Sequence, residues 1–226
     1  MPEGSPQRKY KGRVVFRGSD VRDESHFLAT FQDLGSAPAS MSSGKFLDFL
    51  GLLPGWVLMQ ADAVRAYVQA KLTGVPTWVR IPRDMWPKSW ANMRDPVCPL
   101  VLALYGHPDA GTCWEKHCDG KLREAGFLPI TNWAGCYRHS KLRGVLSVYV
   151  DDFKLACHAD DEKKIWKLLQ GKIKLEDPTM LKQYLGCTHV HHDGDLGQEV
   201  KVPGGWLPIP GYKEASKNKA RQQGTR

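Results

Sequence analysis

Between Val145 and Ala156, hydrophobic residues flank two adjacent carboxylates, Asp151 and Asp152. Short β-branched and apolar runs on either side of a polar pair predict two strands joined by a turn. An ionised carboxylate is costly to bury without a partner, so this pair needs solvent, a cation or a metal ion. An ordinary hairpin turn is the alternative, because Asp is common in turns, where its side chain bonds to nearby backbone.

A helix is predicted after the loop of small residues at 36–43, which offers Ser42 or Ser43 as the N-cap. Apolar residues at helical spacing follow in Phe46–Leu53, and Pro54 ends the pattern.

Two further helices are predicted at about 112–125 and 160–174. The first stops at Gly126, and the second opens with three acidic residues, which favour a helix N-terminus. The predicted buried stripes are Trp114, Cys118, Leu122 and Ala125 in the first helix, and Ile165, Leu168 and Leu169 in the second.

Strands are predicted at 9–18, where basic and apolar residues alternate, and at 56–59, an apolar run that leads to Asp62. The proline-rich stretch 75–99 predicts loops and edge strands, and 186–205 predicts strands and turns. Strands and helices do not alternate regularly, and no glycine-rich phosphate loop is present. This pattern favours an α+β fold over a doubly wound sheet.

Composition adds a preference for a polyanionic partner. Of the 226 residues, 42% are hydrophobic, which is typical of a globular protein. The formal net charge of +8 favours a polyanionic partner, of which nucleic acid is the commonest. Residues 196–226 form a basic tail, expected to be partly disordered or to touch nucleic-acid backbone. The polar N-terminus lacks a signal-peptide core and no run is long enough to span a bilayer, so a soluble, intracellular protein is expected.

The six cysteines include no Cys-x-x-Cys pair and are expected to be free thiols, mainly buried. A zinc site is the alternative, although its spacing fits no common finger; its members would be Cys113, His117, Cys118, Cys136 and His139.

Paired carboxylates suit nucleotidyl transfer if a third carboxylate lies nearby. The reaction uses two divalent ions about 3.5–4 Å apart, and such ions prefer carboxylate oxygens. Asp62 is the best candidate for the third, because it directly follows an apolar strand. Taken alone, Asp62 would be interpreted as a strand-end residue and Tyr67 as a core residue.

The segment Tyr149–Asp152 resembles the active-site hairpin of reverse transcriptases. The segment that opens at Asp62 resembles their first catalytic motif, in which an aromatic residue, here Tyr67, follows the metal-binding Asp. Further matches occur in the family's order, namely Lys9–Gly18, Gly55–Trp56, Trp78–Pro82, Leu104–Gly106 with Trp114, and Leu181–Gly186. From about residue 9 to 188 the chain therefore resembles the reverse transcriptase of copia-type retrotransposons, usually part of a larger polyprotein.

The resemblance implies a right-hand polymerase fold with fingers and palm, an antiparallel palm sheet packed on helices, and a thumb that is largely absent. The implied boundaries are partial fingers at 1–61, palm with the first catalytic Asp at 62–74, fingers at 75–111, palm with the Tyr-Val-Asp-Asp hairpin at 112–195, and the basic tail at 196–226.

The resemblance also implies roles for individual residues. Asp62, Asp151 and Asp152 become catalytic ligands of two Mg²⁺ ions, with Mn²⁺ as a possible substitute. The implied nucleotide-binding residues are Lys11, Arg13, Tyr67, Tyr105 and Gly106, and the implied nucleic-acid-binding residues are Arg17, Tyr149 and Lys182. Lys11, Arg13 and Arg17 could each equally be a solvated surface residue. Asp109 stands where the family carries Gln, and its charge would repel a triphosphate.

The implied function is RNA-directed DNA polymerisation. The expected partners are an RNA or DNA template–primer, deoxynucleoside triphosphates and other Pol domains such as integrase and ribonuclease H, with no membrane. The expected compartment is the cytoplasm, within a virus-like particle, or the nucleus. The alternative is a catalytically inactive, truncated remnant that binds nucleic acid through its basic surface. Binding without catalysis would weaken with salt and ignore magnesium.

Overall fold

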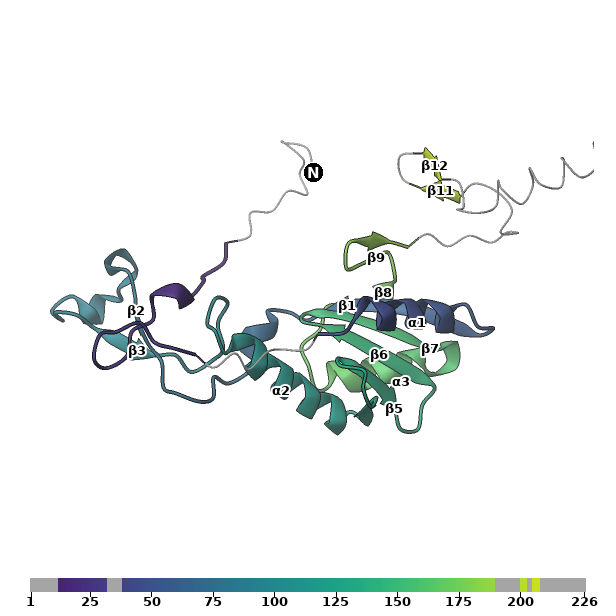
Figure 1. Cartoon of the computed structure of the whole chain (residues 1–226), viewed down its shortest axis with the longest axis horizontal. Coiled ribbons are helices and arrows are strands. Elements are labelled where there is room, and N and C mark those ends of the chain that lie inside the picture. Colours follow the sequence, from purple (N-terminus) through teal and green to yellow (C-terminus); the bar gives the residue numbers. More distant parts are fainter. Residues whose placement is uncertain (1–11, 32–37, 190–199, 203–204, 208–226) are drawn as a thin grey trace, which may run out of the picture. The chain divides into compact units, whose positions relative to one another are not determined.

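The computed structural model describes residues 12–31, 38–189, 200–202 and 205–207, in two units that divide between Met180 and Leu181. The first unit contains a six-stranded antiparallel sheet of order β4-β5-β6-β7-β1-β8 (Figure 1). Its strands are β1 (Trp56–Asp62), β4 (Phe127–Pro129), β5 (Cys136–His139), β6 (Gly144–Tyr149), β7 (Asp152–His158) and β8 (Thr179–Met180). A separate two-stranded ribbon joins β2 (Trp78–Arg80) and β3 (Val97–Pro99). This mixed architecture confirms the α+β prediction.

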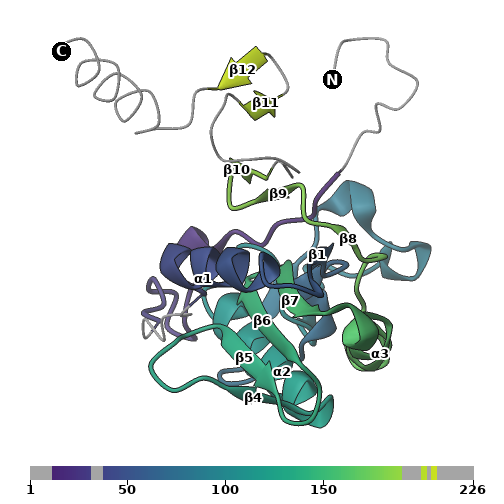
Figure 2. The same cartoon turned by 90° about the vertical axis from the view of Figure 1, so that its right-hand side faces the viewer.

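Helices cover both faces of the larger sheet (Figure 2). They are α1 (Met41–Gly51), α2 (Ala110–Glu124) and α3 (Ala159–Gln170). Alternate residues of β7 point to opposite faces: Phe153 and Leu155 join the cluster that contains residues of α2 and α3, whereas Lys154 bonds to α1. Because both faces are covered, β7 is one continuous buried run rather than an alternating one.

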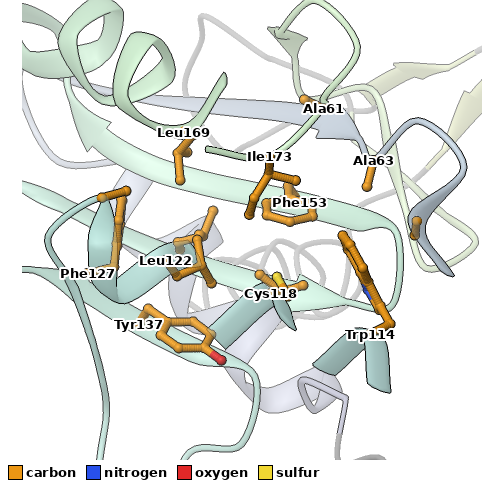
Figure 3. Close-up of a cluster of buried hydrophobic side chains, with 14 of the residues drawn as sticks. Ala61, Ala63, Trp114, Cys118, Leu122, Phe127, Tyr137, Phe153, Leu169 and Ile173 are labelled. Atoms are coloured by element: carbon orange, nitrogen blue, oxygen red, sulfur yellow. The ribbon is translucent and has the colours of Figure 1, made fainter. Parts of the chain in front are cut away.

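The main core lies between the sheet and the pair α2 and α3 (Figure 3). Side chains from the sheet and from both of these helices meet there, among them Ala61, Trp114, Cys118, Leu122, Phe127, Phe153, Ile165, Leu169 and Ile173, each less than a tenth exposed. The predicted stripe of α2 is confirmed, and Gly126 ends this segment with a φ of +91°, where glycine is favoured.

The prediction for α1 was right in kind and wrong at both ends. Ser40 is the N-cap, because its backbone is extended and its side chain accepts a hydrogen bond from the Ser43 amide at 3.2 Å. The helix ends at Gly51, before Pro54, because the chain must turn there to enter β1. Gly51 packs so closely on Leu58 of that strand that a Cβ would lie 2.2 Å from it.

The prediction for α3 needs two corrections. The helix ends at Gln170, with Gly171 as its C-cap, rather than at Lys174. Leu168 is 42% exposed, and Trp166 is buried in its place. A stripe through Ile165 and Leu169 can extend to either side, and only contact with the sheet decided which side was buried.

The predicted strand at 9–18 is wrong over its described part. Residues 12–17 form no strand, and a 3₁₀ turn, η1 (Gly18–Asp20), follows them. The Phe16 amide donates to the Tyr105 carbonyl at 2.7 Å, but the neighbouring chain turns away at Gly106, whose φ is +88°. A single bond without a ladder does not make a strand. Lys9–Lys11 lie outside the described residues.

The second unit is described by itself. It contains two hairpins, one of β9 (Gln183–Tyr184) with β10 (Cys187–Thr188) and one of β11 (Val200–Val202) with β12 (Gly205–Leu207), which agrees with the predicted strands and turns. Most of the basic tail, 196–199 and 208–226, lies outside the described residues. In the part of the chain that is described, no helix has the length and apolar character needed to cross a membrane.

The six cysteines are free, and four of them are buried, as predicted. The alternative zinc site is wrong, because no three His, Cys, Asp or Glu side chains within the described ranges form a group that could hold a metal ion.

Candidate active site

Antiparallel pairing brings three carboxylates to one end of the sheet. The register of β1 with β7 places Asp62 directly opposite Asp152. The hairpin of β6 with β7 places Tyr149 opposite Asp152 as well, and leaves Val150 and Asp151 as the turn between the strands. Residues 90 positions apart in the sequence thus become direct neighbours because their strands pair. Asp62 is exposed, and the other two carboxylates are half-buried.

The turn of this hairpin is strained and is held from two sides. Val150 has a φ of +55°, which is rare for a β-branched residue and costs about 1–3 kcal/mol. The indole N–H of Trp114 in α2 donates to the Val150 carbonyl at 2.7 Å. The amide of Ala63, directly after β1, donates to the Asp151 carbonyl at 2.7 Å. Both turn carbonyls are therefore bonded to elements outside the hairpin, which positions the acidic pair.

The carboxylates concentrate negative charge. Burial, and then the charges of Asp151 and Asp62, raise the pKa of Asp152 to about 6. The pKa of Tyr67 is also raised, by burial first, then by the charge of Asp151 and by Tyr105. A divalent cation would relieve this repulsion, because it favours the ionised carboxylates.

The donor set fits magnesium in type and in charge. Within the described residues, no three His, Cys, Asp or Glu side chains already converge as a group that could hold a metal ion. Mg²⁺ does not need one, since it is usually held by one or two carboxylates and completes its coordination with water and substrate phosphates.

Three of the predicted nucleotide-binding residues meet in one aromatic cluster. Tyr67, in the 3₁₀ turn η2 (Ala66–Gln69), packs edge-on against Tyr105 with ring centroids 4.6 Å apart. The Arg13 guanidinium lies 5.5 Å from the centre of the Tyr105 ring. The exposed cation and the two hydroxyl-bearing rings are thus adjacent, although they come from segments far apart in the sequence.

Gly106 is a position where only glycine fits. A Cβ there would lie 2.1 Å from the Phe16 carbonyl oxygen, and its φ is +88°. The next residue, His107, is buried, accepts a hydrogen bond from the Asp109 amide at its Nδ1, and bonds through Nε2 to the Thr77 hydroxyl at 3.0 Å. Burial lowers the pKa of His107, against an opposing effect of Asp109. Two hydrogen bonds of His107 thus hold this loop, and Asp109 lies at the start of α2.

A small apolar pocket lies against the inner side of the hairpin. Its walls include Tyr67, Trp114, Tyr137, Val148 and Val150. Val150 of the pocket wall also belongs to the strained turn, and Tyr67 also belongs to the aromatic cluster. The pocket therefore adjoins both of them.

The structure does not bring every predicted residue to the carboxylates. Arg17 is a surface residue whose side chain is 82% exposed and lies 4.0 Å from Asp20. Tyr149, by contrast, does lie opposite Asp152, and its side chain is 37% exposed. Lys182 belongs to the second unit, which is described by itself. Lys11 lies outside the described residues.

Sequence reasoning missed a buried cation next to the site. Lys154, two positions after Asp152, is 1% exposed. Its ammonium donates to the Gly44 carbonyl at 2.9 Å and to the Asp48 carboxylate at 2.6 Å, and so fastens α1 to the centre of the sheet. A lysine within the apolar run 145–156 was the signal that could have revealed it.

The family model described as reverse transcriptase (RNA-dependent DNA polymerase) matches residues 3–198. The chain belongs to this family. The match confirms the reverse transcriptase prediction, and membership supports RNA-directed DNA polymerase activity, a nucleotidyltransferase chemistry. The antiparallel sheet and three helices of the described residues are compatible with such a domain.

Proposed function

We propose that the chain is the fingers and palm core of a copia-type retrotransposon reverse transcriptase, with Asp62, Asp151 and Asp152 as the ligands of two catalytic Mg²⁺ ions. The register that sets Asp62 opposite Asp152 carries this proposal, because it joins the two acidic motifs at one sheet end. The raised pKa of Asp152 supports it, since a site built to hold cations accumulates negative charge. Mn²⁺, which also prefers oxygen ligands, would substitute.

Bound divalent ions would supply charge neutralisation and activation of the primer hydroxyl. The chain itself supplies orientation. The Trp114 and Ala63 hydrogen bonds hold the turn, so that Asp151 and Asp152 need little rearrangement when the substrates bind.

The aromatic cluster is the proposed nucleotide site. Tyr67 and Tyr105 would contact the sugar of the incoming deoxynucleotide, and Gly106 would let the backbone approach it closely. Arg13, whose charge is exposed, would contact the triphosphate, with Lys11 as a second cation. Asp109 is separated from Tyr105 of this cluster in sequence only by Gly106, His107 and Pro108, and an intervening cation would offset its repulsion of the phosphates.

The remaining assignments follow the family resemblance. Arg17, Tyr149 and Lys182 would contact the template–primer, and the proposed regions are 1–61 and 75–111 for the fingers, 62–74 and 112–195 for the palm, and 196–226 for the basic tail. Other Pol domains, such as integrase and ribonuclease H, are the proposed protein partners, within a virus-like particle or the nucleus.

The test is primer extension on poly(rA)/oligo(dT) with thymidine triphosphate and magnesium. The wild type is compared with Asp151→Asn and Asp152→Asn, and with Glu24→Gln as a control, because Glu24 is an exposed carboxylate outside the site. We expect each of the two site variants to lose more than about 100-fold in rate and the control to keep its activity. If the folded wild type shows salt-sensitive binding but no extension at any magnesium concentration, the inactive, nucleic-acid-binding remnant is the correct reading.

A further inference from the structure

The β2–β3 ribbon carries an exposed surface that the proposed active site does not use. Its register pairs Trp78 with Pro99 and Arg80 with Val97. Alternation along a strand puts these four residues on one face of the ribbon, and Val79 with Cys98 on the other.

The first of these faces is open to solvent. Trp78 is 60% exposed, Val97 is 47% exposed, and the side chain of Arg80 is 69% exposed. Tryptophan is among the largest apolar side chains, and leaving its ring in water forfeits the favourable burial that it would gain in the core. An indole held out on a paired strand is therefore well placed to receive a flat partner.

Cations outnumber carboxylates in the segment that carries this indole. From Trp78 to Pro99 the chain carries four cations (Arg80, Arg83, Lys88 and Arg94) against two carboxylates (Asp84 and Asp95). The ion pair of Arg80 with Asp95, at 2.8 Å, is exposed on both sides, so it contributes little and can be exchanged for a phosphate. Arg80 lies two residues from Trp78, about 7 Å along the strand, on the same face.

The segment that joins the two strands is ordered by its own contacts. The Trp86 indole N–H donates to the Ile81 carbonyl at 2.8 Å, and the Arg83 guanidinium lies 5.6 Å from the centre of the Trp86 ring. Trp86 is thus committed to the fold of this segment, whereas Trp78 presents its ring to solvent.

We propose that this face of the ribbon binds single-stranded nucleic acid, with one base stacked on Trp78 and a neighbouring phosphate held by Arg80. A stacking ring beside exposed cations is the combination that binds unpaired strands without sequence preference. A protein partner would be favoured by an apolar patch poor in charge, whereas this face carries Arg80 and belongs to a segment in which cations outnumber carboxylates. That the bound strand is the template ahead of the primer rests on the proposed function; the binding itself does not.

The test measures binding of the full chain to a fluorescent single-stranded RNA of about 20 nucleotides by anisotropy, in EDTA and without nucleotides. Catalysis plays no part in this assay, so failure of the polymerase proposal does not affect it. We expect Trp78→Ala to weaken binding at least about fivefold and Trp78→Phe to retain most of the affinity, because a phenyl ring still stacks. Arg80→Gln should lower the slope of log affinity against log salt by about 0.7, the value for one phosphate on a single strand.

Helix α1 provides matched controls. Phe49 is 59% exposed, so Phe49→Ala removes an equally exposed aromatic residue from another surface. Lys45, also exposed on α1, provides the charge control Lys45→Gln. Both controls should bind RNA as the wild type does. Thermal unfolding of every variant establishes that it is folded before its affinity is compared.

Two results would overturn the proposal. One is an RNA affinity equal to that of the wild type in a folded Trp78→Ala variant. If that variant differs from the wild type only in its association state, measured by sedimentation, this face is a protein contact instead. The other is an equal loss in Trp78→Ala and Phe49→Ala. Photo-crosslinking with RNA that contains 4-thiouridine gives an independent answer in the wild type: the adduct should map to the tryptic peptide that contains Trp78, and adducts found only elsewhere would contradict the assignment.

Discussion

Replacing Asp152 by Asn should stabilise the protein while it removes a proposed metal ligand. The half-buried carboxylate of Asp152 faces the charges of Asp62 and Asp151, and burial with this repulsion raises its pKa. Asn has nearly the same shape and no charge. In EDTA, where no divalent ion offsets the repulsion, the substitution should therefore make the folded state more stable.

The magnitude follows from the pKa. The value rises from an ordinary 3.8 to about 6, a difference of about two units. At about 1.36 kcal/mol for each unit, the ionised carboxylate destabilises the folded state by up to about 3 kcal/mol. The group is half exposed, so solvent screening reduces this to about 1–1.5 kcal/mol. For a chain of this size the melting temperature should rise by about 3–5 °C.

The raised pKa of Asp152 also predicts how the stability difference between the wild type and Asp152→Asn changes with pH. A carboxylate with a raised pKa binds its proton more tightly in the folded state, so the wild type loses stability as the pH rises from 3.8 to about 6, and the loss is complete above that range. The advantage of Asp152→Asn should be full at pH 8 and should shrink steadily as the pH falls below about 6.

The measurement is thermal unfolding by circular dichroism in EDTA, at several pH values between about 4.5 and 8. Asp84→Asn is the control, because Asp84 is an exposed carboxylate outside the site and its replacement should change stability by less than about 0.5 kcal/mol. Added magnesium should then stabilise the wild type more than Asp152→Asn, by mass action. A variant that is no more stable than the wild type at pH 8, or a gain that does not depend on pH, would refute the reasoning.

Three further predictions follow from single contacts. Trp114→Phe keeps the ring but leaves the Val150 carbonyl without its indole donor, so it should cost about 1–3 kcal/mol in urea unfolding and lower the extension rate, with an unchanged rate arguing against a positioning role. Lys154→Ala leaves the Asp48 carboxylate without its ammonium and also removes the packing of the side chain, so it should cost about 3–5 kcal/mol. Lys154→Met loses the same charge but keeps the packing and should cost less; a loss equal to that of Lys154→Ala would show that packing is not part of the cause. Gly106→Ala forces a Cβ against the Phe16 carbonyl and should destabilise the protein by more than about 1 kcal/mol, against near-neutrality for Gly120→Ala on α2, where no atom lies within 4 Å of the added carbon.

The elements that hold the active site could be predicted because their patterns are local. Apolar runs on both sides of Asp151 and Asp152 predict a hairpin, and the structure has β6 and β7 there. The stripe that begins at Trp114 predicts α2 almost to its ends. In both cases the burial pattern repeats within one element, so neighbouring residues carry the information.

The errors fall where a distant segment decides. The chain around Arg13 and Phe16 alternates like a strand, but its neighbour at Tyr105 and Gly106 turns away after one hydrogen bond. Leu168 fits a helical stripe as well as Trp166 does, and only the sheet selects between them. Alternation and periodicity predict that a segment has an apolar face, but they do not predict which partner covers it.

The sequence by itself determined the order of the two acidic motifs, the α+β class and the resemblance to reverse transcriptases. Only the tertiary structure decided that Asp62 lies opposite Asp152, that Trp114 and Ala63 hold the strained turn, and that Lys154 is a buried anchor for α1. The physical reason is that strand register and buried polar contacts depend on pairing between residues far apart in the chain. A local pattern of apolar and polar residues does not predict which distant residues pair. The family motifs, by contrast, predict the chemistry from the types of residue that they contain.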